Sequence, residues 1–156
     1  MSSPVVVVMR VAWVFALLVA ACSPAGPRPI AYGNINCDFC RMTVSDERFG
    51  SEFVSAHGKI KTFDSIECLA NYAVLAASLG TPGAVYVSDF NQPGTLIPAE
   101  QATFLRATSL HSPMGRGLVA VAAGADVGAV ARALGAGAPL TWAEVLTLVQ
   151  KEQVRA

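Results

Sequence analysis

The hydrophobic pattern of residues 51–90 changes from the period of a strand to that of a helix and back to that of a strand. This change constrains the fold more than any other feature of the chain. Ser51–Ala56 and Lys59–Phe63 read as two strands bounded by turn residues. The dipeptide His57-Gly58 between them is predicted to be a two-residue hairpin loop.

A helix is predicted to follow these strands. Asp64 is a suitable N-cap residue, and Glu67 stands three residues on, as in a capping box. Apolar residues then recur on one helical face, at Ile66, Leu69, Ala70, Ala73 and Ala77. Gly80 and Pro82 end the helix, and Ala84–Phe90 reads as the next strand. The resulting order is β-β-α-β.

The second half of the chain repeats this order less clearly. We expect strands at residues 102–107 and 117–122 and an Ala-rich helix at 126–135. A short strand at 138–140 and a final helix from 141 onward complete the half. Asp126 and Thr141 are the predicted N-caps, the second with Glu144 at capping-box spacing. We therefore expect an α+β fold of two small ββαβ-type units packed together, over residues 32–100 and 101–156.

An apolar run over residues 11–21 follows Arg10 and ends in small residues before Cys22. This pattern is typical of a secretory signal, with an uncleaved membrane anchor as the alternative. The tetrapeptide V-A-A-C at its end resembles a bacterial lipobox, which implies cleavage before Cys22 and a lipid such as palmitate on its thiol. We expect residues 1–21 to be a signal peptide and residues 22–31 a lipidated, proline-rich tether. The protein would then be anchored to a membrane and face the periplasm or another extracytoplasmic space.

Charge and motif content exclude several classes of function. Lysine and arginine number 11, aspartate and glutamate also number 11, and the formal net charge is zero. No basic stripe is present to neutralise phosphates, so we expect no nucleic-acid partner. The chain also lacks a Ser/His/Asp set, paired catalytic carboxylates and a Gly-rich phosphate loop of recognised spacing. We therefore expect that it is not an enzyme.

Sulfur-containing side chains gather in two short segments. The first is C-D-F-C-R-M at residues 37–42, and the second is H-S-P-M-G at residues 111–115. Thiols and thioethers select Cu(I), whereas Zn²⁺ is usually held by thiolate and imidazole, and Mg²⁺ or Ca²⁺ by oxygen. His111 is a possible additional ligand. The pattern favours copper handling outside the cytoplasm.

The C-x-x-C spacing also has other interpretations. A redox dithiol prefers a helix N-terminus, and the residues after Cys40 show no helical period. A zinc site needs further ligands, for which only Cys68, His57 and His111 remain, and Cys68 is predicted to be a buried, inert thiol. Two alternatives stay open: an exported thiol-disulfide oxidoreductase using Cys37 and Cys40, and a structural adaptor lipoprotein in which the two form a disulfide.

Several spaced motifs together resemble one known family. They are the lipobox cysteine, C-D-x-C-x-M, V-x-D-x-R-F, G-K-x-x-x-F-D-S-I-x-C-L and S-P-M-G-x-G-L-V-A, spread over roughly residues 18–150. This set is similar to NosL, a family of copper-binding lipoproteins accessory to nitrous oxide reductase.

The resemblance implies a lipoprotein of paired ββαβ units that binds one Cu(I). It also implies that the ion passes toward the copper centres of nitrous oxide reductase, with an ABC-type membrane complex as intermediary. Matched by position, the metal ligands are Cys37, Cys40, Met42 and Met114. The family commonly has glycine between the second cysteine and the methionine, where this chain has Arg41.

Overall fold

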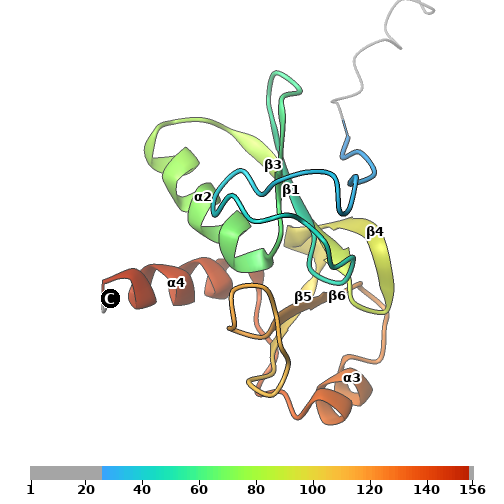
Figure 1. The fold of residues 1–156 in the computed structure, drawn as a ribbon. Coiled ribbons are helices and arrows are strands. Elements are labelled where there is room, and N and C mark those ends of the chain that lie inside the picture. The colour runs from blue at the N-terminus through green and yellow to red at the C-terminus, as the bar shows by residue number, and fades with distance from the viewer. Residues whose placement is uncertain (1–25, 155–156) are drawn as a thin grey trace, which may run out of the picture.

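The described part of the protein contains one mixed β-sheet, and helices pack against it (Figure 1). The structure is a computed structural model in which residues 26–154 are described. The strands are β1 (Ser51–Ser55), β2 (Ile60–Phe63), β3 (Gly83–Asp89), β4 (Gln92–Pro98), β5 (Thr103–Arg106) and β6 (Leu118–Val121). Within the described part their order is β2-β1-β3-β6-β5, and β4 also pairs with β3. The β3–β6 pair is parallel, and the other pairs are antiparallel.

Helices pack against both faces of this sheet. They are α2 (Ile66–Ser78), α3 (Val127–Leu134), α4 (Trp142–Gln153) and the short 3-10 helix η1 (Ala99–Gln101). Helices α2 and α4 contact each other over the main core, whereas α3 lies apart from them and covers a second core (Figure 1). No helix within residues 26–154 has the length and apolar character that crossing a bilayer requires.

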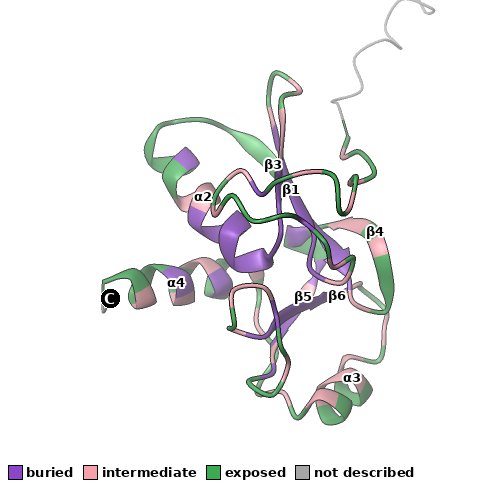
Figure 2. Cartoon of the chain, viewed as in Figure 1, coloured by how far each residue is buried: buried purple, intermediate pink, exposed green. Residues whose placement is uncertain are grey.

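The two cores lie on opposite faces of β6. Leu118 and Ala120 belong to the main core, and Val119 and Val121 belong to the second. Successive side chains of a strand point to opposite faces, so a strand covered on both faces must be apolar throughout. The sequence L-V-A-V meets this requirement, and all four residues are buried (Figure 2).

The predicted α+β fold is confirmed, and most predicted elements fall within a residue or two of the observed ones. Strand β4 was not predicted. The short strand expected near residues 138–140 is reduced to a single bridge between Phe104 and Leu140. The strands of both halves join in one sheet through the β3–β6 pair; the division into units at residue 100 stays a prediction.

The loop between β1 and β2 differs from the prediction. Ser55 donates its N–H to the carbonyl of Lys59 at 2.9 Å, and Gly58 donates to the carbonyl of Ser55 at 2.8 Å. The connection is therefore three residues long, with Gly58 in the left-handed region at φ 76°. Three-residue hairpins place glycine at this position, and the sequence expectation of a two-residue loop was wrong.

The start of α2 also differs from the prediction. Ser65, and not Asp64, is the N-cap, and its side chain accepts the N–H of Cys68. The carboxylate of Asp64 instead accepts a hydrogen bond from the thiol of Cys40. Glu67, expected to close a capping box, is buried with its carboxylate beside the hydroxyl of Ser112.

The predicted signal peptide and the lipidation site Cys22 lie outside the described residues. The part of the predicted tether that is described already contacts the folded domain. The backbone N–H of Arg28 donates to the carboxylate of Glu52 at 3.0 Å, and Ile30 packs against the main core.

Candidate metal centre

Residues 37–42, the cysteine turn, form a closed loop fixed to the edge strand β2. Cys37 donates its N–H to the carbonyl of Met42 at 2.8 Å and accepts the N–H of Arg41 at 3.1 Å. Asp38 ties the turn to β2, because its carboxylate accepts the N–H of Thr62 at 2.9 Å and the ammonium of Lys61 at 3.0 Å. Its own N–H donates to the carbonyl of Thr62. The turn therefore presents its side chains from a fixed backbone.

Arg41 has a φ of 69°, which places it in the left-handed region that favours glycine. No other non-glycine residue within 26–154 has a positive φ. The NosL resemblance places a glycine at this position, and the backbone geometry supplies the physical reason for it. The side chain of Arg41 is exposed beside the turn.

Three cysteines and one aspartate converge next to this turn. The ligand atoms of Cys37, Cys40, Asp64 and Cys68, called here the thiol cluster, all lie within 4.8 Å of one another. Cys37 and Cys40 come from the cysteine turn, Asp64 follows β2, and Cys68 lies in the first turn of α2. Cys37 and Cys68 are buried, Cys40 is half-buried, and all three are free thiols. The cluster thus reaches the surface on the side of Cys40.

The pKa values of the three thiols differ sharply from one another. The neighbouring thiol of Cys68, together with the N–H of Cys40, lowers the pKa of Cys37 from 9.0 to about 6 against the opposing effect of burial. Burial raises the pKa of Cys40 to about 11. The interaction with Cys37 and burial both raise the pKa of Cys68. The lowered pKa makes Cys37 the thiol of the cluster that ionises most readily.

The carboxylate of Asp64 is incompletely paired. Its Oδ2 accepts from the Sγ of Cys40 at 3.3 Å, whereas its buried Oδ1 has no hydrogen-bond partner among the described residues. Buried polar atoms usually have a partner, and one without it calls for an explanation. A cation held by the neighbouring sulfurs would stabilise this carboxylate, so the donor set fits a soft metal ion.

The residues predicted from sequence fall into two groups. Cys37 and Cys40 lie in the thiol cluster. Met42 is 46% exposed beside them, Met114 is half-buried and packs against the main core, and His111 is exposed. Metal ligation by Met42 and Met114 stays a prediction.

Sequence reasoning missed two members of the cluster. Cys68 is buried as predicted, yet its sulfur faces other ligand atoms and not apolar side chains alone. Asp64 was assigned to helix capping. Asp64 precedes the N-cap Ser65 and lies outside the helical period of α2, so no spacing in the sequence paired it with Cys68.

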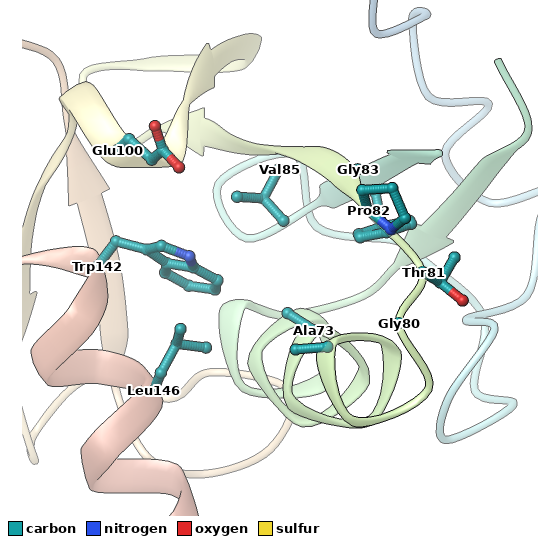
Figure 3. A pocket seen from close by; sticks show the side chains of 11 residues that line it. Ala73, Gly80, Thr81, Pro82, Gly83, Val85, Glu100, Trp142 and Leu146 are labelled. Atoms are coloured by element: carbon teal, nitrogen blue, oxygen red, sulfur yellow. The ribbon is translucent and has the colours of Figure 1, made fainter. Parts of the chain in front are cut away.

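One surface groove of the described part of the protein is separate from the thiol cluster. It has a volume of about 510 Å³ and opens between α2, α4 and the start of β3. Trp142 and Leu146 of α4 face Ala73 of α2 across it, with Glu100 at the rim (Figure 3). No cysteine or methionine lines it, so it takes no part in the candidate metal centre.

The fold and the cluster together define a small α+β protein with a thiol-rich candidate metal centre. The model of the NosL family matches residues 31–147, which is most of the chain. The chain belongs to the NosL family, as its motifs predicted.

Two chains of solved structures also match. One is the crystal structure of the copper chaperone NosL from Shewanella denitrificans, with a TM-score of 0.64 and 21% sequence identity. The match covers 78% of this chain and 96% of that chain, so the two proteins share the fold over nearly the whole solved relative. No curated protein matches the chain.

Proposed function

We propose that this protein is a carrier of Cu(I) that binds one ion at the thiol cluster and passes it to an acceptor protein. The observation that carries the proposal is the convergence of three free thiols within 4.8 Å. Thiolates are among the soft donors that select Cu(I), and they also bind Zn²⁺. The solved relative, a copper chaperone of the same fold, supports this choice of ion.

Zinc is the competing ion for this site. Three thiolates and one carboxylate are a possible tetrahedral set for Zn²⁺, and the position of Asp64 favours this alternative. Against it, exposed Met42 offers a thioether, which has little affinity for Zn²⁺. The sulfur donors therefore favour Cu(I).

Access to the cluster supports transfer of the ion. Cys40 is half-buried and Met42 is exposed on the same turn, whereas Cys37 and Cys68 are buried. An acceptor can approach from the side of Cys40 and exchange ligands one at a time, without releasing the ion into solvent. A closed site with every donor buried would not permit this exchange.

The proposal extends to location and partners. A lipid on Cys22 would hold the protein at a membrane, facing the periplasm or another extracytoplasmic space. The copper would serve the maturation of nitrous oxide reductase, with an ABC-type membrane complex as the direct or indirect partner. These assignments rest on the sequence resemblance to the family and on the lipobox.

The thiols are poorly arranged for a thiol-disulfide oxidoreductase. A reactive cysteine needs both a lowered pKa and exposure. Here the lowered pKa belongs to Cys37, which is fully buried, while the more accessible Cys40 has a raised pKa. The two requirements fall on different residues, which favours metal carriage over catalysis.

Competition titration of the reduced full chain with Cu(I) and with Zn²⁺, against chromophoric chelators, tests the proposal. We expect binding of one Cu(I), with affinity lowered more than about a hundredfold in Cys37→Ser and Cys40→Ser, because loss of a ligand exceeds the usual effect of losing a supporting residue. Unchanged Cu(I) affinity in both variants, or preference for Zn²⁺ over Cu(I), would contradict it.

A matched pair of variants tests the predicted thioether ligand. Met42→Ala is expected to weaken Cu(I) binding, whereas Phe39→Ala is not, although Phe39 lies in the same turn with a similar exposure of 42%. Equal affinities in the two variants would remove Met42 from the ligand set and leave the thiols in place.

A further inference from the structure

Glu67 is a fully buried carboxylate that the thiol cluster does not include. It lies in the first turn of α2, directly before Cys68, and has no exposed surface. Its Oε1 lies 3.4 Å from the hydroxyl of Ser112, and its Oε2 has no hydrogen-bond partner within residues 26–154. Burying a carboxyl group costs free energy unless its partners compensate, so its position requires a reason beyond packing.

The partner of Glu67 lies in the loop of residues 110–117, called here the methionine loop. Ser112 is buried and organises this loop from within. Its hydroxyl accepts the N–H of Gly117 at 2.9 Å, and its carbonyl accepts the N–H of Gly115 at 2.8 Å. Gly117 has a φ of 65°, and a Cβ there would lie 2.0 Å from the carbonyl oxygen of Ala107. The loop is therefore closed tightly around Ser112.

A second carboxylate holds the other end of the methionine loop. Arg116 forms an ion pair with Glu152 of α4, and Arg106 contacts the same carboxylate at 3.2 Å. Burial raises the pKa of Glu67, and the charge of Arg116 opposes part of this rise. The loop is thus attached to α4 through Arg116 and to the first turn of α2 through Ser112.

We propose that Glu67 is a positioning residue that, through Ser112, holds the methionine loop and its Met114 thioether against the helical turn that carries Cys68. The loop and the thiol cluster then keep a fixed relation to each other, although they are distant in sequence. This proposal rests on the proposed Cu(I) site for its role in binding, whereas the positioning itself is a property of the metal-free protein.

Hydrogen exchange of the reduced, metal-free full chain tests the positioning. Glu67→Leu removes the acceptor and is expected to speed exchange of the Gly115 and Gly117 amides roughly tenfold relative to β1, the loss of one hydrogen bond to a carboxylate. Glu67→Gln keeps an acceptor oxygen and should retain most of the protection. Glu100→Gln is the control and should change nothing, because this exposed carboxylate forms no ion pair or side-chain hydrogen bond within residues 26–154.

Glu67→Ala is the second variant if Glu67→Leu fails to fold, and it should speed exchange at the same two glycines. Ser112→Ala removes both the contact with Glu67 and the hydroxyl that accepts the Gly117 N–H, so it should speed exchange by itself. Removing Glu67 in the Ser112→Ala background should add nothing, because Glu67 acts only through Ser112. Exchange at Gly115 and Gly117 as slow as in the parent in the Glu67 variant that folds, or a further acceleration in the double variant, would overturn the proposal.

A second readout separates this proposal from the proposed function. Glu67→Leu should lower the Cu(I) affinity of the parent but should have no further effect in a Met114→Ala background, because its effect acts through the position of Met114. An equal loss in both backgrounds would contradict the positioning role. If the parent itself binds no Cu(I), the proposed function fails while the exchange results still decide the role of Glu67.

Discussion

Arg41 holds a backbone conformation that glycine adopts without cost, because a Cβ in the left-handed region crowds the following carbonyl. Its side chain is exposed and forms no ion pair among the described residues. We expect Arg41→Gly to raise the free energy of unfolding by about 1 kcal/mol, measured by urea denaturation of the metal-free protein. Arg41→Ala keeps the Cβ and is the control; equal stability of the glycine and alanine variants would refute the strain.

The pKa of Cys37 gives a second prediction at the scale of one residue. In the reduced, metal-free protein one thiolate should appear with a pKa of about 6, followed through its ultraviolet absorbance. Cys37→Ser should abolish it, because burial still raises the pKa of both remaining thiols, Cys40 and Cys68, when Cys37 is absent. A titration in which no thiol ionises below pH 8 would contradict the geometry of the cluster.

The same shift predicts a dependence of stability on pH. The folded protein lowers the pKa of Cys37, so the unfolded chain binds this proton more tightly between about pH 6 and pH 9. The contribution of Cys37 is present in full above pH 9, where the thiol ionises in both states, and is lost as pH falls through about 6. The difference in unfolding free energy between the parent and Cys37→Ser should therefore shift in favour of the parent as pH rises from 6 to 9. Buried Glu67 has a raised pKa and acts with the opposite sign, but it is common to both proteins.

The sequence was sufficient to predict part of the candidate site. Cys37 and Cys40 lie close in the chain, so their spacing alone predicted that their sulfurs could share a ligand. Cys68 reaches them only because β1, β2 and the start of α2 fold back over the cysteine turn. A thiol inside an apolar helical stretch is usually inert, and only the tertiary structure distinguishes the two cases.

At the scale of elements, the N-terminal caps of α2 and α4 make a matched pair. Ser65 caps α2 and accepts the N–H of Cys68, whereas Thr141 caps α4, a helix without a cysteine. Ser65→Ala and Thr141→Ala should each lower the unfolding free energy by about 1 kcal/mol. Only Ser65→Ala should also weaken Cu(I) binding, because it loosens the turn that carries Cys68. Equal Cu(I) affinities in the two variants would show that the cap does not support the site.

Elements with a clear period were predicted, and elements without one were missed. The capping box of Thr141 and Glu144 and the cap at Asp126 were confirmed. Strand β4 contains two prolines and a glycine, residues that are rare in strands. It tolerates them because it pairs only with β3 and leaves one edge free of ladder hydrogen bonds.

At the scale of the whole molecule, the first turn of α2 links the two sulfur segments, because Cys68 belongs to the thiol cluster and Glu67 contacts Ser112 of the methionine loop. The β3–β6 pair joins the first half of the chain to the second. The cysteine turn is fixed to β2 at one edge, and the methionine loop leads into β6 near the other. Helix α2 crosses between them and contacts both β2 and β6. A copper carrier built this way can keep its thiols on a rigid frame while one side of the site stays accessible.

X-ray absorption at the copper edge of the Cu(I)-loaded full chain tests the central claim most directly. The account predicts sulfur atoms around copper in the parent, with one fewer in Cys68→Ser than in the parent, because Cys68 completes the cluster with Cys37 and Cys40. Identical copper environments in the parent and in Cys68→Ser would contradict it and would confine the site to the cysteine turn.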